Sequence, residues 1–157
     1  MKLRLLCVGK LSETYLREGC ALFEERLRRY LPLVIEELKE SKTVSRGDLT
    51  RVVAAEGERL LGRIAQGAFV IVLDERGQTL TSVDLAGLLE RHMVAGTAEW
   101  VLVVGGAHGL SEGVRQRANL VLSLSALTYP HQIVRLLLLE QLYRGCTIIR
   151  NEPYHHG

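Results

Sequence analysis

The chain lacks most of the features that mark secreted, membrane-embedded or disordered proteins. Its 157 residues include only 3 prolines and 3 cysteines, and Cys7, Cys20 and Cys146 form no Cys-x-x-Cys pair. Each cysteine stands among aliphatic residues, which favours reduced core thiols over a disulfide or a zinc site. No apolar run approaches membrane-spanning length, and the apolar part of the opening MKLRLLCVGK is too short for a signal peptide. We therefore expect a cytoplasmic protein with no membrane partner and no metal centre.

A strong excess of charge is also missing. The formal net charge is +2, with 24% charged and 47% hydrophobic residues, as in an ordinary globular domain. The basic residues form small groups that are most simply solvated faces: Arg26, Arg28 and Arg29; Arg115 and Arg117; and Lys39, Lys42, Arg46 and Arg51 in or near the first long loop. The loop group is the better candidate for phosphate contacts, because a loop can reach outward.

The chain does contain a regular alternation of apolar strands and amphipathic helices. Strands are predicted at residues 3–8, 33–38, 68–73, 100–104 and 120–124. The last three are apolar except for Ser123, which predicts burial on both faces. Helices are expected between the strands, with Ser12, Ser82 and Ser111 as N-caps, and the final helix spans 131–146. This pattern predicts an α/β fold in which helices sandwich a mostly parallel sheet.

Three loops follow the third, fourth and fifth predicted strands: Asp74–Gln78, read as a turn around Gly77; Gly105–Leu110, with the sequence GGAHGL; and Ser125–Pro130. Ligands of open parallel sheets bind beyond the carboxyl ends of the strands, so neighbouring strands would bring these loops to one pocket. The glycine loop fits a close ligand approach and a tight turn equally well. Asp74 fits a turn-forming residue, or a ligand for a ribose hydroxyl or a cation.

The final helix is apolar almost all round. Its polar strip consists only of Arg135, Gln141 and the Glu140/Arg144 pair. A helix that packs one face on a sheet needs less apolar surface, so a second packing surface, such as a subunit interface, is expected. His131, at the start of this helix, is interpreted as a structural hydrogen-bonding residue.

The tail after this helix, TIIRNEPYHH, combines Tyr154 with His155 and His156. An aromatic ring and two imidazoles that titrate near neutrality are side chains that a functional site can use, so the tail is a candidate part of a site. A tag remnant, a frayed end and adventitious metal binding are the competing interpretations.

Four segments in order resemble one known family: MKLRLLCVGK, a strand ending in VLD, VVGGAHGL, and LSLSALTYPHQIVRLLLLEQLYRGCTIIRNEPYHH. Together they span the whole chain and are similar to the RlmH family, the ribosomal large subunit pseudouridine methyltransferases H. This family belongs to the SPOUT class of S-adenosylmethionine-dependent RNA methyltransferases. The resemblance implies a single SPOUT domain over residues 1–157, a C-terminal trefoil knot, and a homodimer formed through the knotted region.

The resemblance further implies a pocket for S-adenosyl-L-methionine at eight positions: Leu73, Gly105, Leu124, Ser125, Ala126, Leu127, Thr128 and Tyr129. The implied partner is 23S rRNA within the ribosome, and the implied acceptor is N3 of a pseudouridine in a stem-loop. In this reading His155 is the candidate base, and Tyr154 stacks on or hydrogen-bonds to the flipped base. His156 stands where similar proteins often have a basic residue. The rival interpretation is a non-enzymatic ribosome-associated factor with a nucleotide-binding pocket.

Overall fold

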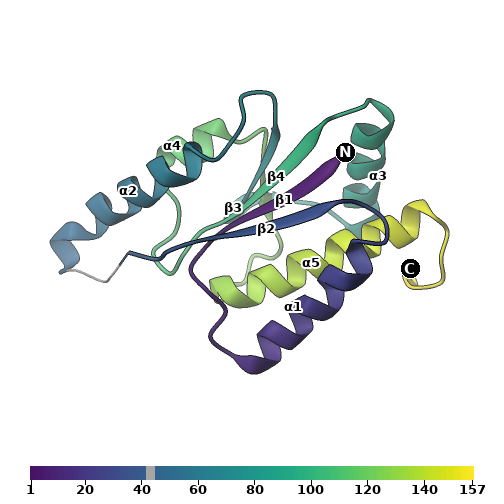
Figure 1. The fold of residues 1–157 in the computed structure, drawn as a ribbon, viewed down its shortest axis with the longest axis horizontal. Coiled ribbons are helices and arrows are strands. Elements are labelled where there is room, and N and C mark those ends of the chain that lie inside the picture. The colour runs from purple at the N-terminus through teal and green to yellow at the C-terminus, as the bar shows by residue number, and fades with distance from the viewer. Residues whose placement is uncertain (42–44) are drawn as a thin grey trace.

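The computed structural model describes residues 1–41 and 45–157, so the candidate phosphate contact Lys42 lies outside the described residues. Its centre is a five-stranded sheet in the order β2-β1-β4-β3-β5, in which every pairing is parallel (Figure 1). The strands are β1 (Lys2–Val8), β2 (Leu33–Leu38), β3 (Phe69–Thr79), β4 (Glu99–Val104) and β5 (Leu120–Ser123). All five predicted strands and the α/β class are confirmed.

Helices cover both faces of the sheet (Figure 1). One face carries α1 (Thr14–Leu27), α3 (Ser82–Val94) and α5 (His131–Ile149), and the other carries α2 (Leu49–Leu61) and α4 (Glu112–Arg117). A short 3₁₀ helix, η1 (Arg46–Asp48), precedes α2. Within the described ranges, no helix combines the length and apolar character needed to cross a membrane.

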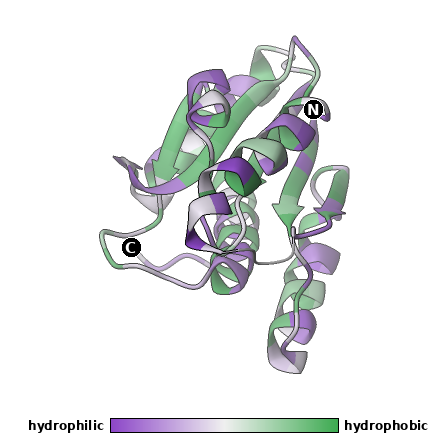
Figure 2. Cartoon of the chain, turned by 90° about the vertical axis from the view of Figure 1, so that its left-hand side faces the viewer, coloured by the Kyte–Doolittle hydropathy of each residue, from purple (hydrophilic) through white to green (hydrophobic). Residues whose placement is uncertain are grey.

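The strand sequences explain this three-layer arrangement. Successive side chains of a strand point to opposite faces, and β1 accordingly sends Leu5 into the core beneath α1 and α5 and Leu6 into the core beneath α2 and α4. Both residues are fully buried. The hydropathy colouring of Figure 2 shows the apolar strands in the interior and the polar residues on the outer helix surfaces and loops.

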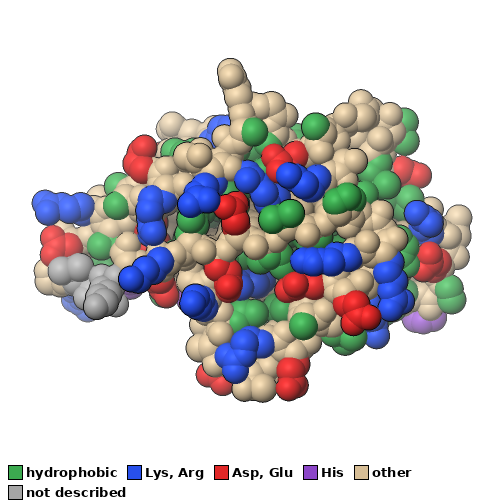
Figure 3. All heavy atoms as spheres, viewed as in Figure 1, with side chains coloured by type: hydrophobic (Ala, Val, Ile, Leu, Met, Phe, Trp, Pro, Cys, Tyr) green, Lys and Arg blue, Asp and Glu red, His purple; other side chains and the backbone are tan. Residues whose placement is uncertain are grey.

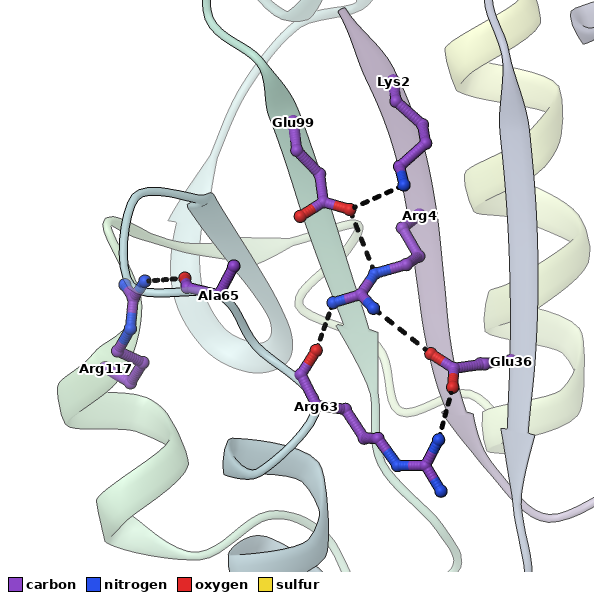
Figure 4. Close-up of polar contacts among 7 residues, drawn as sticks. All are labelled: Lys2, Arg4, Glu36, Arg63, Ala65, Glu99 and Arg117. Atoms are coloured by element: carbon purple, nitrogen blue, oxygen red, sulfur yellow. Dashed lines mark hydrogen bonds and ion pairs between the residues drawn. The ribbon is translucent and has the colours of Figure 1, made fainter.

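Part of the sheet face beside α2 is covered by ion pairs rather than by a helix. Arg4 of β1 lies between Glu99 of β4, 3.2 Å away, and Glu36 of β2, 3.4 Å away, and it also donates to the Arg63 carbonyl (Figure 4). Lys2 pairs with Glu99 at 3.5 Å. These contacts explain why the first strand has cations at alternate positions. Lys2 and Arg4 point to the same face as Leu6, but to a part of it that α2 does not cover.

Some expected helix ends are wrong. Ser12 does not cap α1, which begins at Thr14; instead its backbone N–H and hydroxyl donate to the Gln132 side chain. The cap of α3 is Thr81 rather than Ser82, and Thr81 forms a reciprocal capping box with Asp84. Ser111 caps α4 as predicted, by accepting from the Val114 N–H. A hydroxyl caps a helix only where the chain enters the first turn, and neighbouring hydroxyls leave that position ambiguous.

The predicted turn at Asp74–Gln78 is also wrong, because these residues belong to β3. Leu122 of β5 pairs with Leu73 and again with Gln78, so the intervening residues form an enlarged bulge. Gly77 makes the bulge possible: a Cβ there would stand 2.5 Å from the Val121 carbonyl oxygen. Burial of the last strand on both faces is overturned too, because β5 is an edge strand whose first two residues are half-buried.

Candidate functional site

The three loops at the carboxyl ends of the strands meet in one cavity. Because β4, β3 and β5 are neighbours in the sheet, the glycine loop, the β3 bulge and the segment after β5 come together at one edge. The cavity has a volume of about 850 Å³, and the first residues of α5 close another side of it. This volume suits a nucleotide-sized ligand.

Seven of the eight positions that the family resemblance assigns to the methyl donor line this cavity: Leu73, Gly105, Leu124, Ser125, Leu127, Thr128 and Tyr129. Ala126 is exposed and is not a lining residue. His131 also lines the cavity, from the first turn of α5. The structure therefore brings seven of the eight expected residues together around one cavity.

The glycine loop is held close to its neighbours by side chains from other segments. A Cβ on Gly105 would stand 2.8 Å from Leu110, so the loop folds tightly back on itself. The Glu40 carboxylate accepts a hydrogen bond from the Ala107 N–H at 3.3 Å. Sequence reasoning did not single out Glu40, since a lone carboxylate in a polar loop carries no local signal for this contact.

A charged group occupies the rim of the cavity at the β3 bulge. Asp74 accepts from Arg115 at 2.7 Å and from the backbone and side chain of Arg76, at 2.9 and 3.3 Å. Burial by itself would raise the pKa of Asp74, but these hydrogen bonds and the Arg115 charge lower that pKa to about 2. Asp74 therefore stays ionised, and its ion pair with Arg115 joins the bulge to α4.

The segment after β5 is ordered by hydroxyl groups. Thr128 donates to Glu75 of the bulge at 2.6 Å, and the Leu127 N–H donates to the Ser125 hydroxyl at 3.0 Å. Ser123 donates to the Ser125 carbonyl at 2.8 Å. These hydroxyl groups thus shape the cavity wall and join it to the bulge.

The terminal tail is fixed against the end of α5. Tyr154 donates to Glu140 at 3.0 Å and packs edge-on against Tyr143, with ring centroids 4.6 Å apart. Arg144 donates to Glu140 from Nε at 3.0 Å, lies 4.7 Å from the Tyr154 ring centroid, and contacts His155 Nδ1 at 3.2 Å. Burial, followed by the bond to Glu140, raises the pKa of Tyr154. The tail is therefore an organised part of the structure.

Tyr154 and His155 do not line the cavity of their own chain. The cavity lies at the beginning of α5, near Val134, whereas the tail folds against Arg144 at the other end of the helix (Figure 1). Ten residues of helix separate these two positions, which corresponds to about 15 Å along the axis. The structure thus separates the two groups of predicted site residues.

Arg135 departs from the predicted polar strip of the final helix. It is 3% exposed and donates to Glu37 of β2 at 2.7 Å and to the Gly9 carbonyl at 3.0 Å. This arginine joins α5 to the sheet instead of facing solvent. Two other members of the strip, Glu140 and Gln141, are half-buried rather than buried. The Ser82 hydroxyl donates to Gln141 at 2.6 Å.

Basic side chains outside the cavity do not form a patch of one sign on the face shown in Figure 3, where Lys and Arg alternate with Asp and Glu. Lys39, Arg46 and Arg51 are exposed, as expected for phosphate contacts. Arg117 instead donates to the carbonyls of Ala65, Gln66 and Ala68, at 3.1 to 3.2 Å, and so stabilises the turn before β3.

Comparison with known proteins adds an independent line of evidence. Residues 1–155 match the model of a family described as "Predicted SPOUT methyltransferase". A protein named ribosomal RNA large subunit methyltransferase H from Syntrophotalea carbinolica is 57% identical over 156 residues, which are 99% of each chain. One of the same name from Trichlorobacter lovleyi is 47% identical, over 99% of this chain and 100% of its own.

Two solved structures share the fold at low identity. A probable methylase family protein from Haemophilus influenzae superposes with a TM-score of 0.55 at 13% identity, covering 99% of this chain and 70% of its own. A Legionella pneumophila protein described as a methyltransferase with bound SAM gives a TM-score of 0.52 at 12% identity, covering 90% and 65%.

Proposed function

Because the chain belongs to the SPOUT methyltransferase family, we propose that it transfers a methyl group from S-adenosyl-L-methionine to large-subunit ribosomal RNA. The observation that carries this proposal is the 57% identity, over 99% of both chains, to a protein named ribosomal RNA large subunit methyltransferase H. The acceptor that follows from the family resemblance is N3 of a pseudouridine in a stem-loop of 23S rRNA, on the assembled ribosome in the cytoplasm. The C-terminal trefoil knot likewise remains a prediction from the family.

The cavity has the chemistry that this methyl donor requires. Its inner wall is apolar, with Leu73, Val104, Leu122 and Leu124, and suits the flat adenine ring. Its rim carries the paired charges Asp74 and Arg115, which suit the zwitterionic amino-acid end of the donor. When bound there, the donor would supply an electrophilic methyl group on a sulfonium.

Methyl transfer from a sulfonium is an in-line displacement, so the protein's main task is to position donor and acceptor. The acceptor nitrogen lies between two carbonyls and carries a proton, which makes it a poor nucleophile until that proton leaves. Groups that donate hydrogen bonds to the flanking oxygens would stabilise the anion that develops. Tyr154 and His155 are the residues that we assign to contact the pseudouridine base.

These two residues and the cavity are about 15 Å apart along α5, so one chain cannot place both at the same base. We therefore propose a homodimer in which the tail of one copy faces the cavity of the other. The half-buried apolar residues Ile133 and Leu137 of α5 support this, because they leave an apolar strip beside the cavity for a second copy to cover.

The proposal is tested by incubating the protein with methyl-labelled donor and, separately, with whole ribosomes, isolated subunits and free 23S rRNA. We expect label in one nucleotide of 23S rRNA and none without protein. Calorimetry with S-adenosylmethionine separates the rival, since a non-enzymatic factor predicts no binding of this methyl donor. Ultracentrifugation tests the dimer, and a monomeric active protein would contradict the shared site.

A further inference from the structure

The contact of Arg144 with His155 indicates which ring nitrogen of His155 carries the proton. Its guanidinium group has only N–H donors and no acceptor. The atom it faces at 3.2 Å, Nδ1 of His155, must therefore accept the hydrogen bond. A neutral imidazole that accepts at Nδ1 carries its proton on Nε2, so the opposite edge of the ring, which lies beside Gly157 at the end of the tail, presents an N–H.

We propose that Arg144 is a positioning residue that holds His155 as the neutral tautomer with Nε2–H, and that His155 acts on the RNA base as a hydrogen-bond donor. This inference rests on the proposed function for the identity of the base, but the tautomer itself does not. It replaces the initial assignment of His155 as the base that removes a proton.

The surroundings of His155 oppose the tautomer with its proton on Nδ1. A proton on Nδ1 would face the positive Arg144 guanidinium and would remove its hydrogen-bond acceptor. The Glu140 carboxylate accepts from Arg144 at 3.0 and 2.5 Å and from Tyr154 at 3.0 Å. Glu140 thus orients Arg144 and Tyr154. On α5 the charged and titratable side chains in contact with Tyr154 and His155 are Glu140, Arg144 and Tyr143.

A donor at Nε2 suits the reaction. When the N3 proton leaves to solvent water, negative charge spreads to the two flanking carbonyl oxygens, and an N–H aimed at one of them stabilises that anion. The N3 electron pair then forms the bond to the methyl carbon while the carbon–sulfur bond breaks and its electron pair goes to sulfur. The histidine keeps its proton throughout, so its part in the reaction is electrostatic.

Arginine is suited to this role because its planar fork reaches several partners at fixed angles. Arg144 binds Glu140 through Nε and Nη2, binds His155 through Nη1 and stacks on Tyr154. A lysine at this position would offer a point charge to one partner at a time. We therefore expect Arg144→Lys to keep the fold and to lose the tautomer preference.

The first test reads the tautomer without any activity assay. Side-chain ¹⁵N NMR at pH 7.5 on histidine-labelled protein, with His155→Gln to assign the signals, should show His155 protonated on Nε2 alone. In Arg144→Met and Arg144→Lys the signals should shift toward a mixture of tautomers. Arg150→Met removes another arginine from the same helix end, one that stacks on Tyr30 rather than contacting His155, and should leave the signals unchanged. An Nδ1–H tautomer in the native protein, or an unchanged tautomer in both Arg144 variants, would overturn the inference.

The second test separates a donor from a base. Glutamine presents an N–H near the position of Nε2 but has no basic nitrogen. Turnover on ribosomes should fall about 10²- to 10³-fold in His155→Ala, the usual cost of one lost transition-state donor, and by less than about 10-fold in His155→Gln. The KM for S-adenosylmethionine and the shape of the pH profile should stay the same in His155→Gln.

The donor role is refuted if two results occur together: His155→Ala and His155→Gln lose turnover equally, and the pH dependence of turnover seen in the native protein disappears in His155→Gln. The histidine would then be a base. If the native protein labels no ribosomal RNA, the proposed function fails, whereas the NMR result still decides the tautomer.

Discussion

Replacing Glu37 by alanine should destabilise the protein more than replacing Arg135 by methionine, although both changes break the same ion pair. The two partners differ in burial: the side chain of Arg135 is 4% exposed, and that of Glu37 is 36% exposed. Removing one partner of a buried pair is costly when the charge left behind cannot return to water. The two variants leave very different charges behind.

Among the residues that the structure describes, Glu37→Ala leaves the buried guanidinium with one hydrogen-bond partner, the Gly9 carbonyl at 3.0 Å. We expect a loss of about 3 kcal/mol in the free energy of unfolding, the low end for a broken buried pair, because that carbonyl remains. Arg135→Met keeps an apolar stem of similar length, and Glu37 can hydrate. The main cost is then one unsatisfied carbonyl, about 1 to 2 kcal/mol.

Urea denaturation followed by circular dichroism, at one protein concentration, measures both variants and the double variant. The double variant should resemble Arg135→Met alone, since Glu37 has little to stabilise once the arginine is gone. If Arg135→Met proves at least as destabilising as Glu37→Ala, the reasoning from burial is refuted.

Three further predictions concern the cavity and the tail. Gly77→Ala should cost about 2 to 3 kcal/mol of stability and weaken donor binding in calorimetry, because its Cβ would stand 2.5 Å from the Val121 carbonyl oxygen. Gly67→Ala, which meets no atom within 4 Å, is the matched control, and equal unfolding midpoints would contradict the steric argument. Asp74, with its pKa lowered from 3.8 to about 2, should contribute at most about 2 kcal/mol above pH 4, and this stabilisation should be lost as the pH falls toward 2. Unfolding measured against pH should lack this acid-dependent loss in Asp74→Asn, and an identical profile would argue against the ion pair. Deleting Glu152–Gly157 should abolish methylation while leaving dimer and donor affinity nearly intact; loss of folding would show instead that the tail is structural.

The strands were predictable because their signal is local. Short apolar runs rich in β-branched residues, such as 68–73 and 100–104, favour strands buried between helices, and the structure has them as parts of β3 and β4. Parallel strands end at a common edge, so the meeting of three loops followed from the fold class once the strands were neighbours. That adjacency itself is a tertiary fact.

The wrong predictions arose where one local sequence pattern is compatible with two different structures. Asp74–Gln78 has the composition of a turn, yet it forms an enlarged bulge because β5 pairs with the strand on both sides of it. Arg135 belongs to the short polar strip of the final helix, but it is buried there against two partners from other segments, Glu37 of β2 and the Gly9 carbonyl. Such partners lie 98 and 126 residues away in the chain, beyond any local pattern.

The sequence by itself determined the α/β class and the family, and the family resemblance supplied the predicted donor and base residues. It could do so because side-chain chemistry and strand periodicity are properties of short segments. Only the tertiary structure decided that the cavity and the Tyr154–His155 tail lie at opposite ends of α5, and that Arg144 faces Nδ1 of His155. Distances between segments and the direction of a single hydrogen bond depend on how the helix packs, and packing is set by the whole chain.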